Sequence, residues 1–325
     1  MPSVRVAVFD LGSSSFHLMV VDASRHGVLT PVLRRRSFLH LGTEVARTGG
    51  VPADRATTAV RAVRRLQAAA DDAGADVVVA LATAALRDAD NGARLLGRLE
   101  GVLRTSITLL TGEEEARLCF LGQRAGVWVG RDPVLGLDLG GGSLEAGTGT
   151  VDEVFAVSSV PLGTARLRGE LGTGDLLTQE DRTAVTRLVR ERSQPIRAML
   201  AGVPRARSRV IASGGTVRAL ARLAMVLHRP ETASAASRTV NQVELPAGQL
   251  FELTDRLSTL DLDARLALPG IQARRAPLLP IGAVALSTLV EDLELDRLVV
   301  SEWGLREGAV ISALALQPER RLVPG

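Results

Sequence analysis

Hydrophobic positions in the first 124 residues form short continuous runs that alternate with stretches of helical spacing. Val77–Leu81 is an unbroken apolar run, as a parallel strand buried on both faces requires. Asp54–Ala73 places Val60 and Val63 on one helical face. The pattern therefore predicts an α/β structure. The predicted strands are Val4–Phe9, His17–Val21, Val28–Phe38, Val77–Leu81 and Ser106–Leu110, and the predicted helices are Asp54–Ala73, Ala89–Leu99 and Glu113–Arg124.

The pattern restarts after the segment Arg131-Asp132-Pro133. Each half opens with a strand that ends in Asp-Leu-Gly, at Asp10 in the first half and at Asp138 in the second. A motif that recurs in the same relative place indicates an internal duplication. We therefore expect two α/β domains, residues 1–124 and 125–302, with the two loops facing each other across a cleft. The strands predicted in the second half are Val134–Leu137, Leu144–Gly149, Val154–Val157, Val210–Ala212 and Leu298–Val300.

The two Asp-Leu-Gly loops have the composition of a phosphate site. Their glycines let backbone N–H groups approach an anion, and the hydroxyls of Ser13–Ser15 and Ser143 add donors. Asp10 and Asp138 would repel phosphate directly, so a cation must lie between, and Mg²⁺ takes carboxylate and phosphate oxygens. The alternative is a pair of ordinary turns stabilised by Asp. Two such loops in register across a duplication favour the phosphate site.

The second loop leads into another carboxylate. Glu145 follows Gly141, Gly142 and Ser143 and lies early in the next predicted strand. From there its side chain would help to hold a metal ion or to orient water. The alternative is a surface glutamate on a strand. A Walker A loop is excluded, because it needs a lysine and the chain has none.

Three consecutive carboxylates, Glu113–Glu115, open the helix predicted after the strand Ser106–Leu110. Acidic residues stabilise any helix N-terminus, which explains part of the motif. Thr111 and Glu114 have the spacing of a capping box, which would tie Glu114 to the backbone. Glu115 is therefore the better candidate for a general base that activates water.

Two further segments are candidates for anion binding. Arg87 lies just past a buried strand, where ligands of α/β sheets collect, and arginine pairs bidentately with phosphate. Its alternative role is an ion pair with Asp90. Gly214, Gly215 and Thr216 join a predicted strand to a helix, and a helix N-terminus attracts anions. They would bind the distal part of a long substrate or a nucleoside, unless they form only a tight turn.

Composition narrows the class of protein. The chain has 325 residues, of which 46% are hydrophobic, enough for two cores. The net charge of +3 does not argue for a nucleic-acid partner. No signal peptide or membrane-spanning run is present and the single cysteine fits a reducing compartment, so we expect a cytoplasmic protein with no membrane contact. The four histidines are scattered along the sequence, which disfavours a histidine-rich metal site. We expect Cys119 and His17 to be packing residues.

Together these motifs resemble the exopolyphosphatase/guanosine pentaphosphate phosphohydrolase (Ppx/GppA) family of the actin-like ATPase superfamily. The resemblance runs from the first strand to the last helix. It implies a duplicated actin-like (ribonuclease H-like) α/β fold, with a cleft between two domains. It also implies that a last helix, at about residues 303–316, returns to the first domain. The matching segments are Phe9–Leu18, Ala82–Asn91, Gly112–Leu118, Leu137–Glu145, Pro161–Gly163, Gly214–Thr216 and Trp303–Gly308.

The resemblance implies a metal-dependent hydrolase, with Mg²⁺ or alternatively Mn²⁺. Its expected substrate is inorganic polyphosphate, from which it releases terminal phosphate, or pppGpp, from which it removes the 5′ phosphate. The resemblance assigns catalysis to Glu115, Asp138 and Glu145. It assigns metal binding to Asp10, Asp138 and Glu145, and it makes a homodimer plausible. The phosphate contacts it implies are Gly12, Ser13, Ser14, Arg87, Gly141, Gly142 and Ser143.

The chain departs from the common family pattern at several positions. Ser14 stands where Asn is common, Leu144 where Thr is common, and Pro277 where many members have Asp. The C-terminal helical domain of the long members has no counterpart, so we expect a preference for short polyphosphate. Two other classes of protein fit the sequence less well. The carboxylates argue against a non-enzymatic polyphosphate or alarmone sensor, and the lack of an acceptor-site signal argues against a sugar or acetate kinase.

Overall fold

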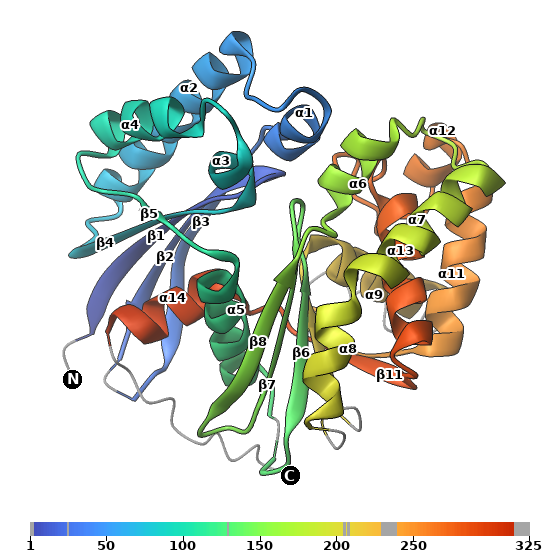
Figure 1. The fold of residues 1–325 in the computed structure, drawn as a ribbon. Coiled ribbons are helices and arrows are strands. Elements are labelled where there is room, and N and C mark those ends of the chain that lie inside the picture. The colour runs from blue at the N-terminus through green and yellow to red at the C-terminus, as the bar shows by residue number, and fades with distance from the viewer. Residues whose placement is uncertain are drawn as a thin grey trace.

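The computed structural model describes residues 3–24, 26–128, 130–203, 206, 209–228 and 239–314. Two mixed sheets lie side by side with helices around them (Figure 1), so the predicted α/β class is confirmed. The first sheet has the order β3-β2-β1-β4-β5. Its strands are β1 (Val4–Leu11), β2 (Ser15–Ala23), β3 (Leu29–Phe38), β4 (Val77–Ala82) and β5 (Thr108–Leu109).

The second sheet repeats this arrangement. Its order is β10-β11-β9-β6-β7-β8, so each sheet combines an antiparallel three-stranded meander with parallel strands added beside its first strand. The predicted duplication is therefore visible in the topology. The strands are β6 (Val134–Leu139), β7 (Leu144–Gly149), β8 (Val154–Val160), β9 (Val210–Ser213), β10 (Glu244–Pro246) and β11 (Arg297–Val300).

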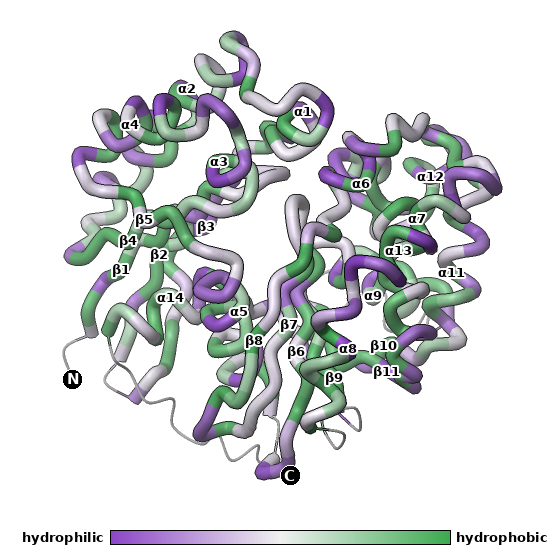
Figure 2. Tube along the Cα trace, in the orientation of Figure 1, coloured by the Kyte–Doolittle hydropathy of each residue, from purple (hydrophilic) through white to green (hydrophobic). Residues whose placement is uncertain are grey.

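Helices surround both sheets, and Figure 2 shows mainly hydrophobic residues along β1, β4 and β5. Four helices accompany the first sheet: α1 (Leu41–Thr48), α2 (Ala53–Asp72), α3 (Ala84–Asp88) and α4 (Gly92–Leu103). Among the described residues, seven further helices follow the meander of the second sheet: α6 (Thr164–Leu171), α7 (Gln179–Arg192), α8 (Gln194–Ala201), α9 (Gly215–His228), α11 (Ala247–Thr259), α12 (Leu262–Leu266) and α13 (Leu279–Asp292). No helix among the described residues is long and apolar enough to cross a membrane.

Two more helices, α5 (Gly112–Gly126) and α14 (Leu305–Ala313), lie side by side between the sheets (Figure 1). Phe120 of α5 packs in a cluster with Val134 and Ile211 of the second sheet. Val310 of α14 packs in a cluster with Val6 of the first sheet. Each helix therefore covers the sheet of the other half of the chain. The domain limits at residues 124 and 125 stay a prediction, and residues 315–316 of the expected last helix lie outside the described residues.

The two helices meet at Gly122 and Gly308, where side chains have no room. A Cβ atom on Gly308 would lie 1.9 Å from the backbone oxygen of Leu118. We expect Gly308→Ala to push the helices apart and to lower the free energy of unfolding by about 3 kcal/mol, as measured by urea denaturation. Gly97→Ala in α4 is the matched control, because a Cβ atom there would meet nothing within 4 Å. The control should be neutral or stabilising by up to about 1 kcal/mol. Equal behaviour of the two variants would contradict the tight crossing.

The predicted helix Ala89–Leu99 is wrong at its start. The structure has the short helix α3, an extended residue at Ala89, and then α4 from Gly92. The side chain of Asn91 explains the break, because its amide bonds both the backbone N–H and the backbone oxygen of Val51. These contacts tie the turn to a distant loop, which no local pattern reveals. The other predicted strands and helices form, with shifted ends.

Candidate active site

The two Asp-Leu-Gly loops meet at a cleft of about 160 Å³ between the two halves of the chain. The loops, α5, the start of α9 and the start of α14 all contribute to its walls. The structure brings thirteen of the fourteen predicted site residues together there. They are Asp10, Gly12, Ser13, Ser14, Glu115, Asp138, Gly141, Gly142, Ser143, Glu145, Gly214, Gly215 and Thr216. The remaining predicted residue, Arg87, is not among the residues that line the cleft.

The two loops are built alike and touch each other. The Gly12 N–H donates to the Ser15 backbone oxygen at 3.2 Å, and the Gly140 N–H donates to the Ser143 backbone oxygen at 3.1 Å. The loops approach so closely that a Cβ atom on Gly141 would lie 2.2 Å from the Ser14 hydroxyl oxygen. Only glycine allows this approach. The duplication seen in the sequence therefore extends to the hydrogen bonds of the two turns.

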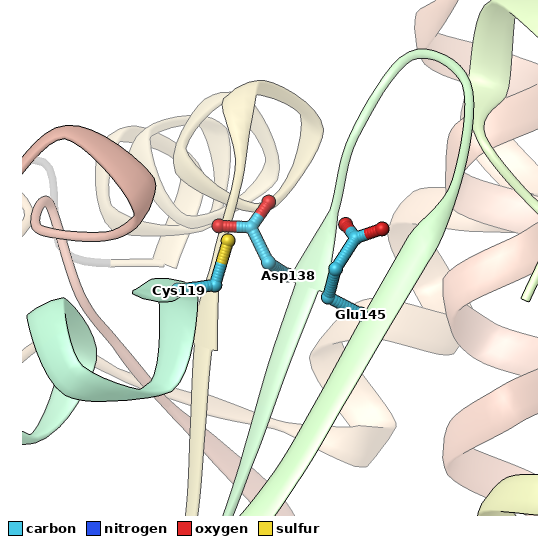
Figure 3. A group of neighbouring side chains, drawn as sticks. All are labelled: Cys119, Asp138 and Glu145. Carbon is cyan, nitrogen blue, oxygen red and sulfur yellow. The ribbon is translucent and has the colours of Figure 1, made fainter. Parts of the chain in front are cut away.

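Asp138 and Glu145 stand opposite each other on paired strands, β6 and β7. Figure 3 shows both carboxylates beside the thiol of Cys119, which comes from α5. One ligand atom from each of the three residues lies within 4.8 Å of the others. The Ser213 hydroxyl donates to Asp138, and the Ser159 hydroxyl donates to Glu145 at 3.0 Å. Two oriented carboxylates therefore form an acidic pair in the cleft wall.

Cys119 is buried, as expected of a packing residue, and its thiol also forms part of the cleft wall. It lies one helical turn after Glu115, so the two side chains share a face of α5. That spacing was the signal for its place beside the cleft. His17, also expected to pack in the core, lines the cleft as well.

Glu115 lies in the first turn of α5, and its side chain is buried. The predicted capping box is present: Glu114 accepts from the Thr111 N–H at 2.8 Å and donates its own N–H to the Thr111 hydroxyl at 3.2 Å. Glu114 is exposed, whereas Glu115 is only 7% exposed. An Arg87 N–H group lies 3.5 Å from the Glu115 carboxylate, and the same nitrogen donates to the Leu110 backbone oxygen at 2.7 Å. Arg87 thus supports Glu115, and its phosphate contact stays a prediction.

Burial raises the pKa of the carboxyl groups that line the cleft, those of Asp10, Glu115, Asp138 and Glu145. It raises the pKa of Asp10 to about 6. It raises the pKa of Glu145 to about 8, and the charge of Asp138 adds to this effect. Burial and the charge of Glu145 hold the pKa of Glu115 well above its usual range, and burial raises the pKa of Asp138 as well. Without a cation, these groups therefore hold their protons more strongly than exposed carboxyls do, and a bound cation would favour their ionised forms.

This donor set fits a divalent cation. The oxygens of Asp138 and Glu145 suit Mg²⁺ or Mn²⁺, whereas the Cys119 thiol is a softer donor than Mg²⁺ prefers. Asp10 lines the same cleft but lies outside the three-residue group. Its carboxylate is 3.9 Å from the Arg306 guanidinium. The predicted role of Asp10 as a metal ligand stays a prediction.

The raised pKa of Glu145 gives a testable pH dependence. Without metal, the folded protein keeps this proton up to about pH 8, while the unfolded chain loses it near pH 4.5. Stability from this group is therefore present at low pH and is lost as pH rises toward 8. A cation binds the ionised form, so we expect Mg²⁺ to raise the melting temperature more at pH 8 than at pH 5.5, by a difference on the order of 3 °C. Thermal denaturation at both pH values measures it. Glu145→Gln should abolish most of the difference, and an equal Mg²⁺ effect at both pH values would contradict it.

Sequence reasoning missed the arginines of the cleft. Arg218, Arg275 and Arg306 line it, although none was predicted as a site residue. Burial and the neighbouring charges of Arg218, Arg36 and Arg274 lower the pKa of Arg275 to about 9. Arginines held together against their mutual repulsion form a site for a polyanion. Arg218 lies one turn into the helix that Gly215 begins, which was the one local signal for it.

Comparisons with known proteins agree with this geometry. A sequence model of the Ppx/GppA phosphatase family matches residues 20–317. Exopolyphosphatase 1 of Mycobacterium tuberculosis is 32% identical over 316 residues, covering 96% of this chain and 88% of that protein. A crystal structure of the Aquifex aeolicus member of the Ppx/GppA family has a TM-score of 0.75 at 27% identity, covering 97% and 98% of the two chains. An exopolyphosphatase structure from Cytophaga hutchinsonii has a TM-score of 0.86 at 22% identity, covering 96% and 98%, and supports the fold.

Proposed function

Because the chain belongs to the Ppx/GppA phosphatase family, we propose that it is an exopolyphosphatase that releases orthophosphate from the end of inorganic polyphosphate. One observation carries this proposal. A single cleft is lined by two carboxylates, Asp138 and Glu145, and by two arginines, Arg218 and Arg275. A chain of phosphates fits such a cleft, because a cation held by the carboxylates would act together with the arginines to neutralise its charges.

The reaction requires water as the attacking group. Glu115 is buried in the cleft wall, and its raised pKa makes it a stronger base than an exposed glutamate. We assign Glu115 the role of the general base that accepts a proton from the attacking water. The backbone N–H groups of Gly141 and Gly142, with the hydroxyls of Ser13 and Ser143, would bind the terminal phosphate, since all four residues line the cleft. Orthophosphate and a shortened chain are the products.

Asp138 and Glu145 would hold the divalent cation, for which Mg²⁺ is the proposed ion and Mn²⁺ the alternative. When bound, the cation would neutralise phosphate charge and polarise the terminal phosphoryl group. The Ser213 hydroxyl, bonded to Asp138, fixes the orientation of that carboxylate. A preference for short chains, a homodimer and a cytoplasmic location also remain proposals.

The competing substrate is pppGpp, which the same cleft would accept by its phosphates. Release of orthophosphate from tripolyphosphate, long polyphosphate and pppGpp at matched concentrations with Mg²⁺ separates these possibilities. We expect faster release from tripolyphosphate than from pppGpp. Faster release from pppGpp would replace the proposed substrate, and no release from any of the three would overturn the proposed reaction.

A further inference from the structure

Three side chains, two from β2 and one from α14, form a hydrogen-bonded chain along one wall of the cleft. Arg306, near the start of α14, brings its guanidinium to 2.6 Å from Nδ1 of His17 in β2. Nε2 of the same ring lies 2.8 Å from the hydroxyl oxygen of Ser15. All three residues line the cleft. Residues separated by nearly the whole chain thus converge beside the first Asp-Leu-Gly loop.

The chemistry of the partners fixes the direction of each hydrogen bond. A guanidinium only donates, so Nδ1 of His17 must accept and carries no proton. A neutral imidazole then has its hydrogen on Nε2, which donates to the Ser15 hydroxyl oxygen. Protonation of Nδ1 would place two N–H groups and two positive charges against each other. Burial and the charges of Arg306, Arg36, Arg218 and Arg275 all lower the pKa of His17, in agreement with a neutral ring.

The Ser15 hydroxyl uses its oxygen as the acceptor for His17, so its own hydrogen is available for another partner. Ser15 is only 8% exposed and lines the cleft beside Gly12 and Ser13. We propose that Arg306 and His17 aim the Ser15 hydroxyl hydrogen at an oxygen of the bound phosphate. His17 is then a positioning residue, and Ser15 is the group that touches the substrate. The identity of the phosphate compound rests on the proposed function, but the hydrogen-bond chain does not.

Binding of inorganic phosphate in the presence of Mg²⁺, followed by calorimetry, tests this arrangement without turnover. Ser15→Ala should raise the Kd about tenfold, as expected for a lost hydrogen bond to a charged group. His17→Phe should raise it by a similar factor, and His17→Gln, which keeps a donor and an acceptor, should recover part of the loss. His228→Gln is the control, because His228 pairs with Glu252 at the far end of α9 and should leave the Kd unchanged.

The double variant Ser15→Ala/His17→Phe separates positioning from a merely structural role. If His17 acts through Ser15, the double variant should bind phosphate about as well as either single variant. Additive losses, or an unchanged Kd for Ser15→Ala, would overturn the proposal. In polyphosphate hydrolysis, the double variant should likewise lose no more kcat/KM than either single variant does. A wild-type protein that binds phosphate but hydrolyses no polyphosphate would remove the proposed function while leaving the binding test intact.

A spectroscopic test reads the wild-type protein and needs a variant only to assign the signal. The ¹⁵N NMR spectrum of the wild-type imidazoles should show His17 as a neutral ring with the hydrogen on Nε2. The signal is assigned by its loss in His17→Gln, since the chain has only four histidines. An imidazolium or an Nδ1–H ring at neutral pH would contradict the direction of the hydrogen-bond chain.

Discussion

Replacing Glu115 with glutamine should lower kcat for polyphosphate hydrolysis by about a thousandfold, the effect typical of a lost general base. Glutamine has nearly the same size and keeps an oxygen beside Arg87, which lies 3.5 Å from the carboxylate. It cannot accept the proton of the attacking water at neutral pH. Substrate binding should change little, because the loops and the arginines hold the phosphates. Steady-state phosphate release and calorimetric binding of tripolyphosphate measure the two effects.

Glu113→Gln is the matched control for this experiment. Glu113 lies in the same first turn of α5, but its side chain is exposed and is not part of the cleft wall. Its kcat should stay close to that of the wild type. If Glu115→Gln retained turnover within a few-fold of the wild type, another group would have to activate the water.

Asp138→Asn should abolish turnover by removing the cation rather than the base. Asp138 lines the cleft, where it stands opposite Glu145 and is bonded to Ser213. Asparagine fills the same space but removes one of the two charges that would hold Mg²⁺, so we expect Mg²⁺ affinity to fall by at least about a hundredfold. The metal-free variant should also melt at a higher temperature than the wild type at neutral pH, because it no longer buries that charge. Calorimetry with Mg²⁺ and thermal denaturation measure both effects.

Asp132→Asn controls for the loss of an acidic residue just before β6, since Asp132 is exposed and outside the cleft. It should leave Mg²⁺ binding and melting temperature unchanged. Unaltered Mg²⁺ affinity in Asp138→Asn would move the metal site elsewhere. Lost turnover together with a lowered melting temperature would instead indicate damage to the fold.

Local sequence patterns predicted the acidic part of the site because its residues carry local signals. Asp10 and Asp138 end equivalent strands of a duplication, so their meeting across a cleft follows from topology. The capping box separated Glu115 from Glu114, and the structure has both the box and the buried Glu115. The α/β class could also be predicted, because the alternation of apolar runs with stretches of helical spacing is a local signal.

The basic part escaped prediction because its residues converge from distant segments. Arg218, Arg275 and Arg306 lie in three separate stretches of the chain, and an isolated arginine on a helix or loop is usually a surface residue. Their charges combine only after the halves of the chain pack together. The environment of His17 depends in the same way on α14 crossing to the first sheet. Composition and spacing contain no record of such long-range contacts.

The central claim is that this cleft hydrolyses polyphosphate from its ends. The ³¹P NMR time course of a polyphosphate of defined length, with protein and Mg²⁺, tests it most directly. We predict that the orthophosphate signal rises while internal phosphate groups disappear and the signal of chain ends stays constant, and that Glu115→Gln shows none of these changes. A growing signal of chain ends, or phosphate loss only after an acceptor molecule is added, would contradict terminal hydrolysis.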